Sequence, residues 1–139
     1  MPAYDPELGA LVSAWLTFDP SLPGGGEPHY EADTRLKLLS FDEPLLAWQV
    51  VLLIAAATSE TRLLRQLGAG RLEDLLSHDP EQFIPMAIEE ATVNPHVQEA
   101  LLGVWLCRHD SSDALLGQLE SAVLGFQRRA ACGCEAKGA

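Results

Sequence analysis

Lysine and arginine are scarce in this chain, and two long stretches contain neither. Nine Lys and Arg residues stand against 20 Asp and Glu residues, which gives a formal net charge of −11 at pH 7. The stretches without Lys or Arg are residues 1–34 and 72–107. Nucleic-acid binding requires clustered basic residues that displace counterions, and anionic membrane surfaces attract basic segments. We therefore expect neither nucleic acid nor a membrane surface among the partners of this protein.

Other sequence features are also absent. The longest apolar run, Val50–Ala57, is far shorter than the roughly 20 residues of a membrane-spanning helix. No basic segment followed by an apolar stretch opens the chain, so we expect no secretory signal. Three cysteines, an odd number, then favour reduced thiols and a cytoplasmic location. The triple glycine at residues 24–26 lacks the Lys-Ser or Lys-Thr of a phosphate-binding loop, and no Gly-x-Ser-x-Gly nucleophile motif occurs.

The region from Asp42 to Leu106 is rich in residues that are typical of helix ends. Side chains of Asp, Ser and Asn accept the free N–H groups of a first helical turn, and proline fits just inside a helix start. Glycine ends helices in a left-handed conformation. The predicted starts are Asp42, Ser59, Asp79 and Asn94, and the predicted stops are Gly68 and Gly70. Because few residues lie between these signals, neighbouring helices are expected to run antiparallel.

Apolar residues recur along most of the chain at the three- and four-residue spacing of helix faces. Leu45–Ala57 is apolar on nearly every side, so we expect it to be the buried central helix. The last helix is capped by Asp110 or Ser111, and its apolar face consists of Leu115, Leu116, Leu119, Val123 and Phe126. The sequence thus predicts an all-α domain over residues 1–129, a compact stack of about seven or eight short antiparallel helices that is HEAT-like, armadillo-like or an irregular helical bundle. A disordered tail over residues 130–139 should follow.

Histidine and aspartate supply the main candidates for chemistry. They are the pairs His78-Asp79 and His109-Asp110, together with His29 and His96. Histidine–aspartate metal phosphohydrolases are helical and use such pairs, because imidazole and carboxylate ligands suit a divalent metal that activates water. Asp79 and Asp110 also occupy helix-cap positions, where their carboxylates would accept backbone N–H bonds instead. A metal-dependent hydrolase is therefore an alternative, and our main expectation is no catalytic residue, no metal and no cofactor.

Two cysteines near the C-terminus give a further alternative, a thiol or metal-binding site at Cys132 and Cys134. A zinc ion requires four ligands, and only Cys107 and His109 remain to complete this pair. Cys107 lies in an apolar sequence and is expected to be a buried, small hydrophobic residue.

The three tryptophans fall within the apolar patterns of three different helices. They are Trp15, Trp48 and Trp105. Aromatic side chains contribute the largest buried areas, so we expect all three in the core. The alternative is that one of them contributes to an interface with a partner.

The acidic residues between positions 72 and 107 lead to our main functional hypothesis. Solvation of helix faces and capping explain part of them, since carboxylates are favoured near helix N-termini. The functional alternative is an acidic face that binds a basic protein partner. The residues assigned to this face are Glu73, Asp74, Glu81, Glu89, Glu90 and Glu99. With no credible catalytic set, the chain is expected to be a non-catalytic binding module rather than an enzyme.

Several short motifs between Leu45 and Leu106 carry a family resemblance. They are the Ala-rich central helix, Leu67-Gly68-Ala69-Gly70-x-Leu72-Glu73-Asp74-Leu75-Leu76, Phe83-Ile84, Asn94-Pro95 and Ala100-Leu101-x-Gly103-Val104-Trp105. With these motifs the segment resembles an uncharacterised bacterial family, a domain of unknown function. The resemblance implies no activity and no catalytic residues. In size and acidity the chain also resembles bacterial immunity proteins, which neutralise toxins, so an immunity protein that binds a basic toxin is the most concrete form of the hypothesis.

Overall fold

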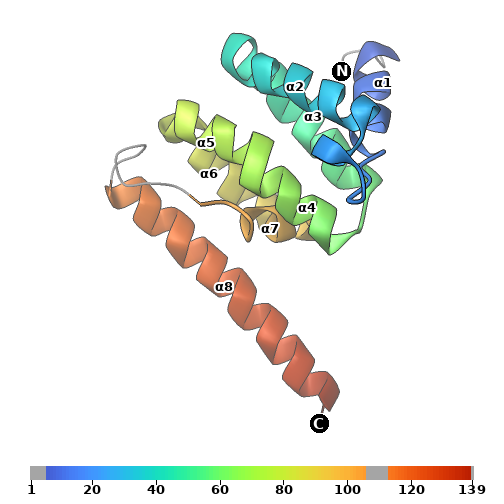
Figure 1. Cartoon of the computed structure of the whole chain (residues 1–139). Helices are drawn as coiled ribbons and strands as arrows, with labels where there is room; N and C mark the ends of the chain where they lie inside the picture. Colours follow the sequence, from blue (N-terminus) through green and yellow to red (C-terminus); the bar gives the residue numbers. More distant parts are fainter. Residues whose placement is uncertain (1–5, 106–112, 139) are drawn as a thin grey trace.

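The chain folds into two groups of packed helices with one long helix alongside them (Figure 1). A computed structural model describes residues 6–105 and 113–138, with side chains as far as Gln127. Within these ranges there is no strand, and the predicted all-α stack of short helices is confirmed. The helices are α1 (Pro6–Trp15), α2 (Glu27–Asp42), α3 (Pro44–Ala57), α4 (Thr61–Leu67), α5 (Glu73–His78), α6 (Pro80–Ala91), α7 (Pro95–Leu101) and α8 (Asp113–Gly138). Helices α1–α3 form one group and α4–α7 the other, and α2 and α3 also contact the second group.

The central position predicted for Leu45–Ala57 is confirmed by α3. Its side chains Ala47, Val50 and Ile54 are fully buried, and the helix contacts α1, α2, α5 and α7. Burial of apolar area supplies the main favourable term in folding, and a helix surrounded by others contributes most to it.

Helices α4 and α5 form one nearly continuous rod rather than two helices separated by glycine stops (Figure 1). Gly68 has φ −62° and ψ −46°, which is right-handed helical backbone. The chain continues through a π-helical turn, η2 (Gly68–Leu72), directly into α5. In the described residues, positive φ angles occur at Gly24, Gly25 and Gly26 and not in this rod. The prediction that Gly68 and Gly70 end a helix is therefore wrong.

Gly68 instead permits a close contact between two backbones. A Cβ atom on Gly68 would lie 1.7 Å from the carbonyl oxygen of Ala100 on α7. A Cβ atom on Gly103, just after α7, would lie 2.1 Å from the carbonyl oxygen of Arg65 on α4. The two glycines thus let the rod and the end of α7 touch without side chains between them, which fixes where the chain leaves α7.

Of the four caps predicted between Asp42 and Leu106, two are confirmed, and the cap predicted at Asp110 or Ser111 lies outside the described residues. The Asp79 carboxylate accepts the Gln82 amide N–H at 3.3 Å at the start of α6. The Asn94 side-chain oxygen accepts the amide N–H groups of His96 and Val97 at 3.1 and 3.4 Å at the start of α7. Both side chains satisfy amides that have no partner within their helix.

The predicted caps at Asp42 and Ser59 are wrong. Asp42 is the last residue of α2, and α3 follows Glu43 without a side-chain cap. Before α4 the residue at the cap position is Glu60, which makes no side-chain cap hydrogen bond. Since proline has no amide N–H, Pro44 already leaves one fewer group to satisfy at the start of α3.

We expect Asn94→Ala to lower the free energy of unfolding by about 1 kcal/mol, because two amide N–H groups lose their acceptor. The matched control is Ser59→Ala, which removes a side chain that caps no helix and should change stability by less than about 0.5 kcal/mol. Urea unfolding monitored by circular dichroism measures both variants. Equal losses in the two variants would contradict the assignment of the caps.

The triple glycine forms the break between α1 and α2. Residues Pro23–Gly25 make a single 3-10 turn, η1, and all three glycines have positive φ, from 62° to 96°. In the same loop, the Ser21 hydroxyl and the Ser21 amide donate to the Asp19 carboxylate, and these hydrogen bonds hold the pKa of Asp19 below its usual value. The loop needs glycine for its backbone conformation, in contrast to Gly68.

A polar network joins α1, α2 and the α4–α5 rod. The Trp15 indole N–H donates to the Asp33 carboxylate at 3.0 Å. The Arg71 guanidinium lies 3.4 Å from Asp33 and 3.4 Å from Asp74. Only 14% of the Arg71 side chain is exposed, against 34% of Asp33 and 26% of Asp74, so this cation interacts with both carboxylates in a partly buried environment. The π-helical turn, which contains Arg71, thereby connects the two groups of helices.

Helix α8 packs against α6 and α7 and extends beyond the helical groups (Figure 1). Its predicted apolar face is confirmed, since Leu116, Leu119 and Phe126 are buried. The backbone of this helix is described as far as Gly138, and the predicted domain boundary at residue 129 and the disorder of residues 130–139 stay predictions. Alanine, the best helix former, is frequent in residues 130–138.

None of the helices in the described residues combines the length and hydrophobicity that a membrane span requires.

Candidate functional site

The six predicted acidic residues differ in what they contact. Three of them interact within the protein. Glu73 accepts the backbone N–H of Trp105 at 2.6 Å, and Asp74 takes part in the Arg71 network. Glu99 on α7 lies 3.6 Å from Arg65, and more than half of that arginine side chain is exposed. These carboxylates therefore contribute to the structure around α5 and α7 as well as to its charge.

The other three predicted residues lie on α6. Glu81 and Glu89 are exposed, and Glu90 is half-buried. Within the described ranges, none of these three carboxylates pairs with a basic side chain. Glu81 lies in the first turn of α6, and Glu89 and Glu90 lie in its last turn. We call these three residues together the α6 acidic surface, although they do not share one side of the helix. Its partner-binding role stays a prediction.

The candidates for hydrolase chemistry are placed apart. His78 lies at the end of α5, with its ring edge-on to Phe41 at 5.4 Å, and Asp79 caps α6. His29 is buried against Trp15, and its Nδ1 contacts the Trp15 carbonyl oxygen. His96 contacts the Ala55 carbonyl oxygen in the same way.

The remaining candidate ligands lie elsewhere in the chain. His109, Asp110 and Cys107 fall outside the described residues, as do the side chains of Cys132 and Cys134. The described part of the chain gathers no three His, Cys, Asp or Glu side chains that could hold a metal ion.

Trp105 does not lie in the core, which corrects the sequence prediction. Trp15 and Trp48 are buried as expected, but 83% of Trp105 is exposed. The helix α7 ends at Leu101, so Trp105 does not continue its apolar face. A tryptophan exposed to this degree is unusual, because the indole ring is largely apolar.

Two contacts hold the backbone beside Trp105. Gly103 presses against the carbonyl oxygen of Arg65, and the Trp105 amide donates to Glu73. The intervening Val104 donates its amide to the Leu101 carbonyl oxygen at 3.1 Å. The direction of the chain after α7 is thus fixed by the α4–α5 rod, and Trp105 is presented at the surface on a constrained backbone.

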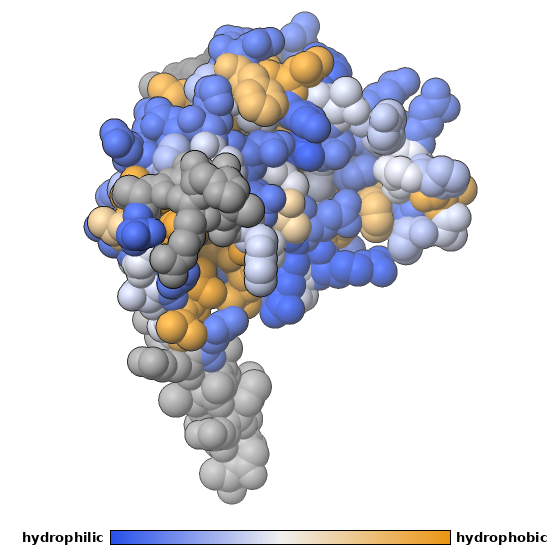
Figure 2. Space-filling view, turned by 60° about the vertical axis from the view of Figure 1, so that its left-hand side comes forward, coloured by the Kyte–Doolittle hydropathy of each residue, from blue (hydrophilic) through white to orange (hydrophobic). Residues whose placement is uncertain are grey.

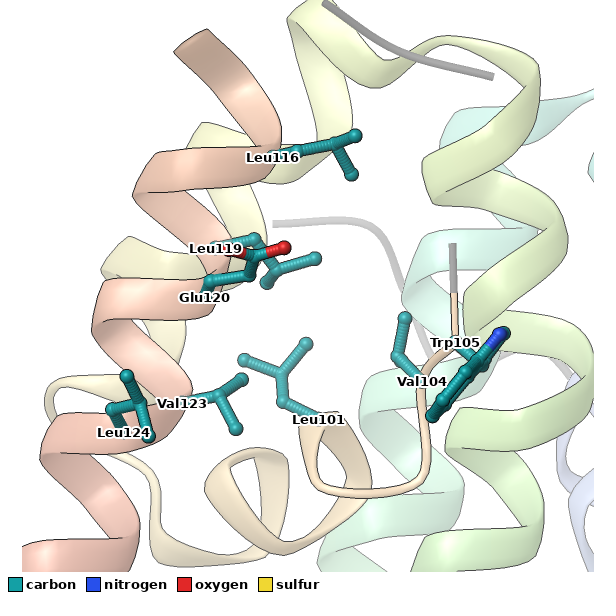
Figure 3. Close-up of a pocket in the computed structure, with 8 residues that line it drawn as sticks. All are labelled: Leu101, Val104, Trp105, Leu116, Leu119, Glu120, Val123 and Leu124. Atoms are coloured by element: carbon teal, nitrogen blue, oxygen red, sulfur yellow. The ribbon is translucent and has the colours of Figure 1, made fainter. Parts of the chain in front are cut away.

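An apolar groove lies between this segment and α8. Its volume is about 400 Å³, which is within the size range of ligand-binding pockets. The groove is lined by Leu101, Val104, Trp105, Leu116, Leu119, Glu120, Val123 and Leu124. Figure 3 shows that three side chains from α8 point toward the opposite wall, namely Leu116, Leu119 and Val123. We call this feature the α7–α8 groove.

The surface around the α7–α8 groove is apolar inside and acidic at its edges. Leu124 is 50% exposed at the rim. Figure 2 shows hydrophobic surface, in orange, gathered where α8 leaves the helical groups. Glu120 lines the groove on α8, and Glu73 lies at Trp105 on the other side. No Lys or Arg occurs in residues 72–105 or 113–127, so no basic residue of the described walls offsets these charges.

Sequence reasoning missed this groove because it assigned most of the apolar residues that line it to covered helix faces. One feature of the sequence could have indicated the groove. Leu124 does not belong to the apolar face predicted for α8, which contains Val123 and Phe126, and an apolar residue outside such a face is exposed. The exposure of Trp105 depends on contacts of Gly103 and Glu73 with distant parts of the chain, which no local pattern indicates.

The comparisons with known proteins bear on family membership alone. No curated protein and no solved structure matches the chain. One family model, described as a family of unknown function, matches residues 26–123, which include α2 to α7, the first part of α8 and all the groove-lining residues except Leu124. The expected resemblance to an uncharacterised family is thereby confirmed. The chain belongs to this family of unknown function, DUF6869.

Proposed function

We propose that this protein is a non-catalytic module that binds a basic protein partner through the α6 acidic surface. The main support is that two of the arginines pair with carboxylates while three carboxylates on α6 have no basic partner in the part of the chain that the structure describes. Arg65 and Arg71 already interact with carboxylates, whereas Glu81, Glu89 and Glu90 have no basic partner in the described residues. A net charge of −11 adds long-range attraction for a cationic molecule.

The most concrete form of this proposal is an immunity protein that acts in the cytoplasm on a basic toxin. Such a protein needs no chemistry of its own, because covering the active site of the toxin is sufficient. Complementary charge accelerates encounter and excludes partners of the same sign. The attraction should weaken as ionic strength rises, since the Debye length falls from about 10 Å at 0.1 M salt to about 3 Å at 1 M.

The test compares two triple variants that change the net charge equally. The first is Glu81→Lys, Glu89→Lys and Glu90→Lys. The control is Glu31→Lys, Asp42→Lys and Glu43→Lys, which alters exposed positions on and after α2. Binding is measured by calorimetry with the purified protein that co-purifies from the source cells, at low and at high salt.

We expect the α6 variant to bind at least about tenfold more weakly and to lose most of its salt dependence, because close charge pairs across an interface contribute about 1.5 kcal/mol or more. The control variant should retain an affinity near that of the wild type. If both triple variants bound the partner more weakly to the same extent, the effect would come from net charge and not from the α6 acidic surface. An affinity that ignores both salt and the α6 substitutions would overturn the proposal.

A further inference from the structure

We propose that the α7–α8 groove binds an amphipathic helix of the protein partner, with apolar side chains toward the groove and basic side chains along its edges. This inference rests on the proposed function, because it names the form of a basic partner segment. It uses a surface other than the α6 acidic surface, so the two can fail separately.

The shape of the groove favours a helix over other peptide conformations. Proteins recognise peptides chiefly by strand addition to a sheet edge, by aromatic clefts for polyproline segments, or by apolar grooves for amphipathic helices. The described residues contain no sheet edge, and Trp105 is the single aromatic lining the groove. Along α8 the groove extends from Leu116 to Leu124, roughly two helical turns, which suits the spacing of apolar residues on one helix face.

Trp105 has the properties of a residue that dominates an interface. Tryptophan is enriched among the few residues that carry most binding energy, and its burial removes about 200 Å² from water. Its backbone is already held by Gly103 and Glu73, so binding requires little ordering of the chain. Leu124 lines the rim of the groove on α8 and is half exposed, so it is free to contact the bound helix.

Charge decides between a basic partner and a second copy of this chain. Glu120 lines the groove and Glu73 lies at Trp105, with no Lys or Arg in the described walls. A second copy would bring another net charge of −11 to this site, and like charges repel. A segment with Lys or Arg beside its apolar stripe instead complements both the groove and its edges.

The experiment uses the fluorescence of Trp105 in the full chain and three synthetic peptides of about four helical turns each. The first peptide carries leucine at the helical spacing of one face and lysine elsewhere. The second replaces lysine by glutamate, and the third has the composition of the first in scrambled order. The Trp105→Phe variant supplies the blank, because Trp15 and Trp48 are buried and contribute equally to both spectra.

We expect the leucine–lysine peptide to shift Trp105 emission to the blue with saturable binding, and the other two peptides to bind at least about tenfold more weakly. Leu124→Ser should weaken binding of this peptide by about tenfold or more. The matched control is Leu38→Ser on α2, a leucine of similar exposure away from the groove, which should have no effect. Both substitutions are at exposed sites and should leave the fold intact.

Three outcomes would overturn this inference. Equal binding of the scrambled peptide would assign the effect to charge alone. Equal effects of the two leucine variants would place the peptide elsewhere. A shift of Trp105 emission that appears with protein concentration alone would assign the groove to a second copy. Whether the α6 acidic surface binds the partner is tested separately, with the triple variant of Glu81, Glu89 and Glu90.

Discussion

Replacing Gly68 by alanine should destabilise the protein by about 3 kcal/mol or more, which is the largest effect that we expect of a single substitution in this chain. The added methyl group would lie 1.7 Å from the carbonyl oxygen of Ala100, which is backbone and cannot move aside as a flexible side chain would. The α4–α5 rod and α7 must then separate, and the contact between Gly103 and Arg65 is lost with them.

The matched control for this substitution is Gly70→Ala. A Cβ atom at Gly70 has nothing within 4 Å, and its backbone is helical, so alanine should be neutral or stabilise by about 0.5–1 kcal/mol. Calorimetric melting should show a fall of about 10 °C for Gly68→Ala and no fall for Gly70→Ala. If both glycines were helix stops, both substitutions would destabilise, and that result would contradict the close contact as the reason for Gly68.

Removing the Arg71 guanidinium should have the second-largest effect, a loss of about 2–3 kcal/mol in the free energy of unfolding. In Arg71→Ala, the carboxylates of Asp33 and Asp74 would face each other without a cation. Breaking a fully buried pair costs about 3–5 kcal/mol, and the partial exposure of both carboxylates lowers that figure. Denaturant unfolding of the variant measures the loss.

Arg65→Ala provides the control for charge. Arg65 pairs with Glu99 at 3.6 Å, but its side chain is 53% exposed, so the loss should be below about 1 kcal/mol. A double-mutant cycle of Arg71→Ala with Asp33→Ala should give a clear coupling energy. Similar losses for the two arginines would show that the Arg71 network does not join the two groups of helices.

Most features of the fold that depend on local interactions followed from the sequence, although the caps predicted at Asp42 and Ser59, which are also local, were wrong. The caps at Asp79 and Asn94, the apolar α3 and the face of α8 all depend on residues a few positions apart, and all are confirmed. The same local rules failed at Gly68. A glycine after a helix usually signals its end, but here the requirement comes from Ala100, on another helix.

Only part of the candidate site could be predicted from the sequence. The acidic composition of residues 72–107 indicated a basic partner, and α6 carries three of the predicted residues without basic partners in the described ranges. The α7–α8 groove depends on how the chain turns after α7, which Gly103 and Glu73 determine through contacts with α4 and at Trp105. Such contacts arise from tertiary packing. The spacing of apolar residues along the sequence, from which Trp105 was predicted to be buried, does not reveal them.

Hydroxyl-radical footprinting of the complex with the natural partner tests the central claim most directly. Radicals oxidise exposed side chains, and Trp105, Leu124 and Val93 beside the α6 acidic surface are all exposed in the free protein. We predict that these three lose reactivity on binding, while Tyr30 and Phe41, which are also exposed, keep theirs. Protection of Tyr30 and Phe41 with unchanged reactivity at Trp105 and Val93 would contradict the proposed binding surfaces.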